Sequence, residues 1–463
     1  MVVPLIGIPT IIVAAEAIAD NLSANDLYPK SKQVIEGLQS HGVNVVSYAS
    51  DGAAVERSVQ DLFISEARAT LSIKVPDPEE KQYTVQIPLF GPTGSPVVMV
   101  QDSKHTLKTL RNNLFSGARV LVLGNHPAMY SQVRDIAFSN LPDSPVYRHD
   151  VEKMDRQDNN AATRLFSATT LGFIEKHYSD RTGLAVYLFV IGEAVDAYQS
   201  RTISHLERLK MVLRCRYFLR LWKRFLKAAE YPEARYYISK EADDILSKLI
   251  DGLLALIYVY RDKLCGEYPL LPWMHSTEIV EHVFAECRKL VKDFTHLNFI
   301  FMTVRLHVLV RLASEMGQGI DPKARAMGYS HSYLDPEAAC LRSLAMFPSD
   351  HEIEIASGQA WEEAVTLFNL LGIQADDIPP SPDPTSTPGD ASTTVGNGDK
   401  QEVHGDEQDL EDDNEETTAA AVQRMIGLQE LPNWNTVEPQ LQDKMHALTC
   451  AAMALDVEDQ EKL

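Results

Sequence analysis

The spacing of apolar and polar residues divides the chain into an alternating β/α part and a long helical part. Over the first hundred residues, β-branched runs bounded by Gly and Pro alternate with stretches of helical period. The predicted strands are 2–6, 10–15, 43–50, 82–89 and 96–100, and the predicted helices are 25–38 and 53–67. This alternation predicts a mixed or mostly parallel sheet with helical crossovers.

From residue 103 to about residue 270 the helical period is nearly continuous, and no strand is clear. The helices predicted there are 103–114, 128–138, 159–175, 183–198, 203–229 and 242–260. Two more follow at 276–292 and 298–316, and two shorter acidic helices are predicted between 333 and 372. The pattern therefore predicts a fold of strands, an all-α block, and then further helices.

Composition changes abruptly after residue 375. Residues 376–416 consist largely of Pro, Ser, Thr, Gly, Asp and Glu, and nine of the sixteen residues 401–416 are acidic. Such a segment cannot bury enough apolar surface to fold, so it is predicted to be a disordered acidic linker. A short helical tail is predicted beyond it, at 418–428 and 437–455.

Charge and cysteine usage exclude several classes of protein. The formal net charge of −22 argues against a basic coat for nucleic acid over the whole surface. None of the five cysteines forms a CxxC pair, so neither a zinc module nor a disulfide framework is indicated, and a reducing intracellular compartment is expected. No apolar run reaches the roughly 18 residues of a membrane helix.

Four acidic residues stand where chemistry could occur. Asp51 and Asp102 each close a predicted strand and precede a helix, and Glu278 and Glu281 share one side of a later helix. An Asp in that position is most often a turn or N-cap residue, and a Glu pair is usually a solvated face. The functional alternative is a site where converging carboxylates hold two divalent cations for phosphodiester chemistry. In that alternative Asp51, Asp102 and Glu281 together hold the metal.

A basic helix stands out within this acidic chain. The stretch 203–229 carries Arg214 and seven further basic residues that are candidate DNA contacts: Arg208, Lys210, Arg216, Arg220, Lys223, Arg224 and Lys227. Aromatic residues are interleaved with them. The simpler interpretation is an amphipathic helix with a packed aromatic face and a solvated basic face. The other is a strip that contacts DNA phosphates, for which the acidic linker could compete.

Five segments, in order over about residues 10–315, resemble motifs of one family. Residues 43–52 resemble the strand with the second catalytic aspartate of P-element-type transposases, and 101–112 resemble their D-P-x-H-L-x-K-x-x-R-N motif. Residues 152–167 resemble the start of their insertion domain, 189–201 their F-D-x-x-N-S-R motif, and 276–284 their S-Q-D-x-x-E-x-x-F motif. The chain also resembles the fungal genomic proteins descended from such elements.

This resemblance implies a DDE enzyme with an RNase H-like core split by a large all-α insertion. It makes Asp51 and Glu281 the second and third catalytic acids and ligands of Mg²⁺. The domains expected from it are an N-terminal part of the core without its first strand (1–102), an all-α insertion domain (103–270), C-terminal helices of the core (271–318), a helical extension (319–375), the acidic linker (376–417) and the helical tail (418–463).

The departures from the family pattern bear on activity. The first catalytic aspartate belongs on the opening strand of the fold, and no acid precedes Glu16, so the chain is expected to be an N-terminally truncated relative without most of the activity. The DNA-binding zinc module is missing as well. The resemblance assigns Asp196 and Ser167 to a nucleotide site, but Gln199 stands in place of an Asn, so GTP binding is not expected.

The sequence thus predicts a transposase-derived protein of nuclear rather than cytoplasmic location, with its catalytic role lost. A first alternative is a non-catalytic protein that binds DNA, or binds proteins through the helical block and the acidic linker. A second is a nuclease that is still active. The sequence leaves the oligomeric state open.

Overall fold

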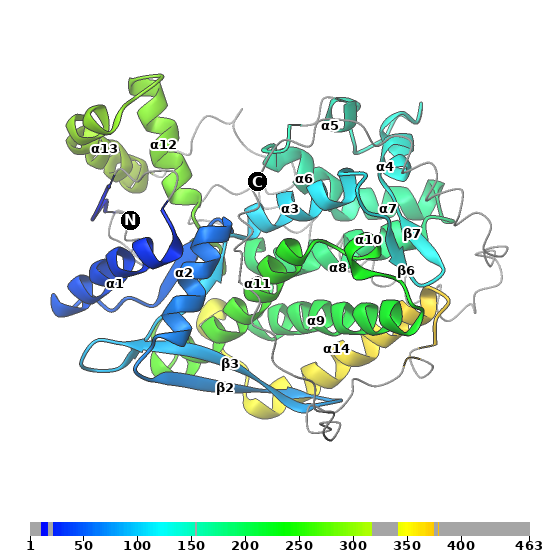
Figure 1. Cartoon of the computed structure of the whole chain (residues 1–463), viewed down its shortest axis with the longest axis horizontal. Helices are drawn as coiled ribbons and strands as arrows, with labels where there is room; N and C mark the ends of the chain where they lie inside the picture. The colour runs from blue at the N-terminus through cyan, green and yellow to red at the C-terminus, as the bar shows by residue number, and fades with distance from the viewer. Residues whose placement is uncertain (1–10, 17–21, 153–154, 317–340, 375–377, 379–463) are drawn as a thin grey trace, which may run out of the picture.

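The structure, a computed structural model, describes residues 11–16, 22–152, 155–316, 341–374 and 378. These residues form a mixed α/β fold in which helices predominate (Figure 1). The predicted strand 2–6, the acidic linker apart from Ile378, the helical tail and part of the helical extension lie outside the described residues.

Three small sheets contain the described strands. β1 (Ser47–Ser50) pairs in parallel with β5 (Val98–Gln101), and Ser50 lies opposite Gln101. β2 (Thr70–Asp77), β3 (Lys81–Phe90) and β4 (Ser95–Pro96) form an antiparallel sheet, and β6 (Leu121–Leu123) and β7 (His126–Ala128) form a hairpin. The sheets are therefore mixed, and the mostly parallel alternative is wrong for the described part of the chain.

The helices α1 (Ala24–Ser40) and α2 (Ala54–Ser65) pack on each other next to the β1–β5 pair. The body of the molecule follows as a run of helices. They are α3 (Ser103–Phe115), α4 (Tyr130–Ala137), α5 (His149–Glu152), α6 (Asn159–Leu165), α7 (Ala168–His177), α8 (Thr182–Gln199), α9 (His205–Ala228), α10 (Glu233–Tyr236) and α11 (Lys240–Tyr258). A π-helical turn, η1 (Val259–Lys263), extends α11.

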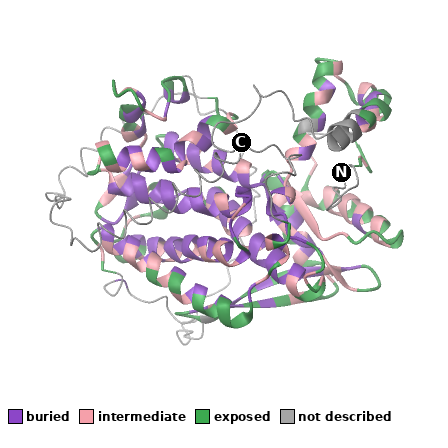
Figure 2. Ribbon diagram, turned by 180° about the vertical axis from the view of Figure 1, so that it is seen from behind, coloured by how far each residue is buried: buried purple, intermediate pink, exposed green. Residues whose placement is uncertain are grey.

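Helix α8 is the centre of the helical body. Every residue from Thr182 to Gln199 is buried except Asp196, because the helix is apolar on all sides (Figure 2). Two glycines let neighbours approach its backbone. A Cβ atom on Gly183 would lie 2.3 Å from the His126 carbonyl oxygen, and one on Gly192 would lie 2.7 Å from that of Phe166. Larger residues would push these segments away from α8.

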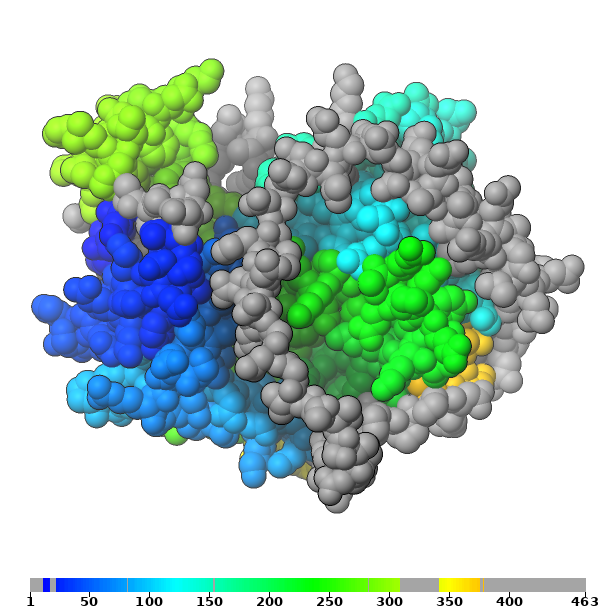
Figure 3. Space-filling model, in the orientation of Figure 1, coloured from blue at the N-terminus to red at the C-terminus, as the bar shows by residue number. Residues whose placement is uncertain are grey.

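Three further elements complete the described fold. α14 (Asp350–Leu370) begins with a capping box at Ser349 and packs along α9. The helix pair α12 (Glu278–Leu290) and α13 (His296–Met316) forms a lobe at one end of the molecule (Figure 3). The short 3₁₀ turns η2 (Pro272–Met274) and η4 (Ser343–Ala345) lie in the connections.

Several sequence predictions need correction. Residues 11–16, predicted as part of a buried strand, contain a single bridge at Ile11, and Ile11 and Val13 are exposed. Strands β2, β6 and β7 were not predicted: β6 and β7 have only three residues each, whereas the alternation of Leu71, Ile73 and Val75 with polar residues in β2 was overlooked. The helix predicted at 159–175 is two helices, since Ser167 ends one and caps the next.

The region between 333 and 372 also differs from the prediction of two acidic helices. Its described residues form one long helix, α14, preceded by the turn η4. No helix in the described part of the chain combines the length and the apolar character that crossing a membrane requires.

Candidate functional site

The carboxyl ends of β1 and β5 bring two of the predicted acids onto adjacent strands. The parallel register pairs Ser50 with Gln101, so Asp51 and Asp102 are the next residue on each strand. The Asp102 amide donates to the Ser50 carbonyl at 2.9 Å, which continues the pairing. The first turn of α12 contributes Glu278 and Glu281. Three separate segments therefore place acids at one edge of the β1–β5 pair.

Asp102 is a buried structural cap. Its side chain belongs to a residue that is 2% exposed, and its Oδ1 accepts from the amides of Lys104 and His105 at 2.9 and 3.0 Å. Its Oδ2 accepts from the amide and the hydroxyl of Thr277 at 2.9 and 3.0 Å. Both oxygens are therefore occupied, and the side chain joins the start of α3 to the start of α12.

The two glutamates on α12 are ion-paired with the first turn of α3. The Lys104 ammonium lies 2.8 Å from Glu278, and both side chains are largely buried. His105 Nε2 contacts the carboxylate of Glu281. The His105 contact is the largest influence on Glu281 and lowers the pKa of its carboxyl group. Burial by itself lowers the pKa of His105, but its contact with Glu281 and the nearby Asp102 raise it overall.

Lys108 lies one helical turn beyond Lys104 and is 6% exposed. Burial is the largest influence on its ammonium group and lowers its pKa. The carboxylates of Glu281, Asp102 and Asp51 each act in the opposite direction. An ammonium group thus lies within electrostatic reach of three of the four predicted acids.

Asp51 is exposed, as is Glu281, and the Asp51 Oδ1 accepts from the Ala53 amide at 3.0 Å. This is the turn contact that an Asp after a strand commonly makes. Within the described residues, no group of three or more His, Cys, Asp or Glu side chains has the geometry to hold a metal ion.

Sequence reasoning found the four acids but gave no role to the basic residues between them. Lys108 lies about one turn beyond both Lys104 and His105 on the helix that Asp102 begins, and this spacing was a signal in the sequence. The partners on α12, more than 170 residues away, could not be identified from spacing.

The two residues predicted for a nucleotide site have structural surroundings. Ser167 caps α7, accepts from the Thr170 amide at 3.3 Å and donates to the Arg164 carbonyl at 2.8 Å. Asp196 is half-buried near the end of α8. Gln199 donates to the hydroxyl of Ser103 at 2.7 Å and so connects α8 to α3. Nothing in these contacts tests the assignment of Asp196 and Ser167 to a nucleotide site or the expectation that GTP does not bind there.

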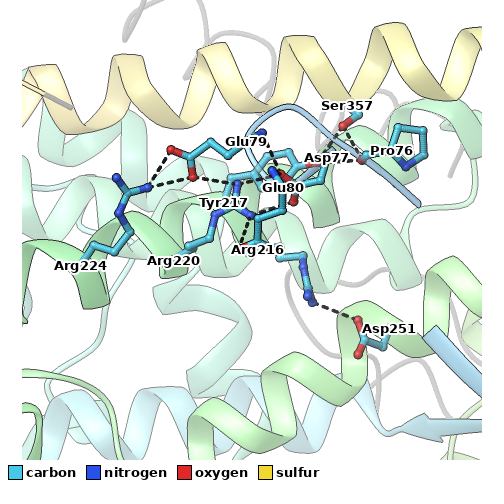
Figure 4. A network of polar contacts seen from close by, with 10 residues as sticks. All are labelled: Pro76, Asp77, Glu79, Glu80, Arg216, Tyr217, Arg220, Arg224, Asp251 and Ser357. Carbon is cyan, nitrogen blue, oxygen red and sulfur yellow. Dashed lines mark hydrogen bonds and ion pairs between the residues drawn. The ribbon is translucent and has the colours of Figure 1, made fainter. Parts of the chain in front are cut away.

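Most of the basic residues on α9 face carboxylates of this same chain. Arg220 contacts Asp77 with both terminal nitrogens, at 2.8 and 3.1 Å, and Arg224 contacts Glu79 at 2.7 Å (Figure 4). Asp77 is the last residue of β2, and Glu79 lies in the turn that follows it. The Arg216 guanidinium lies 3.2 Å from Asp251 and 3.7 Å from the centre of the Tyr83 ring.

Three of the other four predicted DNA contacts also have partners within this chain. Arg208 is fully buried and donates to the carbonyls of Ala197 and Ser200 at the end of α8. Lys210 pairs with Glu207 and Glu363, and Lys223 pairs with Asp243. Lys227 is exposed. The basic face of α9 is therefore largely neutralised within the described structure, although DNA binding by these side chains stays a prediction.

Replacing Asp102 by Ala tests its role as a cap. The change leaves two amides at the start of α3 and the Thr277 groups without their acceptor, so we expect a loss of about 2–3 kcal/mol in the free energy of unfolding. Urea denaturation measures this loss. Asp51→Ala is the matched control, because that exposed carboxylate accepts one hydrogen bond and should cost about 1 kcal/mol or less. Equal losses for the two variants would contradict the assignment of Asp102.

Comparisons with known proteins give little beyond these contacts. No protein-family model matches the chain, and no curated protein matches it. Among solved structures, a chain of the Drosophila P element transposase strand transfer complex is similar, with a TM-score of 0.46 and 16% identity. The match covers 62% of this chain and 64% of the solved chain, which is slightly less than two thirds of its length.

Proposed function

We propose that the chain is a transposase-derived protein that no longer cleaves or transfers DNA strands. The ancestry is supported by the five motif resemblances, which fall in order along the chain. The loss of activity is supported by one observation above all. Asp102, the acid that would join Asp51 and Glu281 as a ligand, uses both carboxylate oxygens to cap α3 and to hold Thr277.

The donor set does not fit the pair of Mg²⁺ ions that such chemistry needs. A two-metal site requires several carboxylates whose oxygens face a common position. Here Glu278 is paired with Lys104, Glu281 is in contact with His105, and the Lys108 ammonium lies among the acids. Basic groups of the protein supply the positive charge that bound cations would bring. We derive no catalytic step from this cluster.

The folded body retains a binding role. Its large helical surface binds protein partners, and DNA is a candidate ligand because of the family resemblance. A location in the nucleus follows from that ancestry. The oligomeric state is not part of the proposal.

A titration and a cleavage assay together test the loss of activity. We expect isothermal titration with Mg²⁺ or Mn²⁺ to give equal, negligible heats for the wild-type chain and for Asp51→Asn. We also expect no metal-dependent nicking of supercoiled DNA by either protein, since Asp102, Glu278 and Glu281 are engaged by groups of the protein and do not face a common metal position.

Metal-dependent nicking that disappears in Asp51→Asn would refute the proposal and establish the second alternative, an active nuclease. Glu56→Gln is a suitable control for that outcome. It also removes a carboxylate near β1, but this one accepts a hydrogen bond from the Tyr48 hydroxyl and is not one of the four candidate acids.

A further inference from the structure

One face of α13 is apolar and uncovered within the described structure. The opposite face packs on α12, where Phe299, Met302 and Leu306 meet Val283 and Cys287. The uncovered side chains are large, and their exposed fractions are high: Leu297 60%, Ile300 52%, Phe301 76%, Val304 76% and Val308 53%. A contiguous patch of this kind on a soluble protein usually marks a surface that another element covers.

The spacing of this patch indicates what kind of element fits it. Leu297, Phe301, Val304 and Val308 follow one another at intervals of four, three and four residues. This spacing is typical of the seam between the helices of a coiled coil, where each apolar side chain packs into a hole on the facing helix. A helix with the same spacing is therefore the complementary partner.

The same chain carries a segment with that spacing. In the predicted tail helix 437–455, apolar residues recur at intervals of four, three, four and three, at Leu441, Met445, Leu448, Ala452 and Leu455. This segment lies outside the described residues. Residues 379–436 connect this segment to Ile378, and 58 residues can extend to roughly 190–210 Å.

Charge complementarity favours the same pairing. Residues 294–314 contain two Arg and two His but no Asp or Glu, and Arg305 is exposed beside the patch. Residues 437–455 contain two acidic residues and one Lys, and four more acidic residues and one Lys follow at 456–463. Opposite charges flanking an apolar seam select the partner and its orientation.

We propose that residues 437–455 form a helix that docks on the exposed face of α13 in the same molecule. The tail then completes the small core of the α12–α13 lobe. Because α12 carries Glu278 and Glu281, docking also restrains the helix that faces Lys104 and His105. The inference does not depend on whether the acidic cluster is active.

Hydrogen exchange of the full-length chain tests the docking. In the wild-type protein, amides in both 297–308 and 437–455 should be protected. The double variant Leu441→Asp with Leu448→Asp should raise exchange over residues 297–308 by about tenfold, because two apolar contacts on α13 are lost. The control Ala447→Asp with Cys450→Asp alters the outer face of the same predicted helix and should leave α13 protection unchanged.

The reciprocal variant Val304→Asp should raise exchange over residues 437–455, while light scattering shows a monomer throughout. Unprotected tail amides in the wild-type chain would overturn the proposal. So would a dimer that Val304→Asp dissociates and the tail variants leave intact, because a second copy would then cover α13. Unchanged α13 protection in the Leu441→Asp, Leu448→Asp variant would overturn it as well.

Discussion

Replacing Arg214 by Met is expected to lower the free energy of unfolding by about 3–5 kcal/mol. Arg214 is 3% exposed in the middle of α9 and forms an ion pair with Glu193 of α8. Its Nε donates to Glu363 of α14 at 2.7 Å. The guanidinium thus connects three helices of the body. Met keeps much of the side-chain volume but leaves the carboxylate of Glu193, which is 8% exposed, without its cation.

The size of this effect comes from the carboxylate that remains. An unpaired buried charge costs far more than the pair contributes when it is intact. We therefore expect the double variant Arg214→Met with Glu193→Met to recover much of the lost stability. The urea midpoint of each variant measures the change.

Lys227→Met is the matched control, because Lys227 lies on the same helix and is exposed. Its replacement should change stability by about 0.5 kcal/mol or less. If Arg214→Met were no more destabilising than Lys227→Met, the buried ion pair would not be a support of the helical body.

Acidification from pH 7 to pH 5 is expected to destabilise the fold through two buried histidines, by about 2 kcal/mol for each. Burial lowers the pKa of His205 and that of His275 from 6.5 to about 4. Below pH 6.5 the unfolded chain takes up these protons and the folded chain does not. Stability therefore decreases as pH falls, until the folded groups titrate near pH 4.

The contacts explain why the folded state resists protonation. His205 Nε2 donates to the Leu344 carbonyl at 2.7 Å, its ring stacks on Phe347, and its buried Nδ1 has no hydrogen-bond partner in the described structure. His275 lies between Ser47 and Tyr260, whose hydroxyls are 2.7 and 3.2 Å from its ring nitrogens. A second proton on either ring would bring a buried charge without a counter-ion.

The measurement is the slope of unfolding free energy against pH, from urea titrations between pH 7 and pH 5. The double variant His205→Gln with His275→Gln should show a much shallower slope, whatever its absolute stability. His105 has the opposite sign, because its raised pKa makes its contribution complete below pH 6.5 and lost at higher pH. A double variant with the wild-type slope would show that other groups cause the acid sensitivity.

The sequence determined most of the helices and the residues where strands end. The helical period predicted α1, α2, α3, α8, α9 and α11 close to their observed bounds, because long amphipathic or wholly apolar runs admit few other structures. It also placed Asp51 and Asp102 at the ends of two strands. Strands β2, β6 and β7 escaped prediction although each belongs to a local hairpin, because β6 and β7 are too short to show a period and the alternation in β2 was overlooked.

Only the tertiary structure decided what the candidate residues do. An Asp between a strand and a helix is most often a turn or cap residue but can also be a metal ligand. Asp102 caps α3 through Lys104 and His105, and Thr277, 175 residues away, engages its other oxygen. The sequence shows no ion-pair partner for the basic residues of α9. In the fold, however, Arg220 pairs with Asp77, the last residue of β2, and Arg224 pairs with Glu79 of the following turn. Local patterns fix secondary structure, whereas the partner of a charged side chain depends on which distant segments the fold brings together.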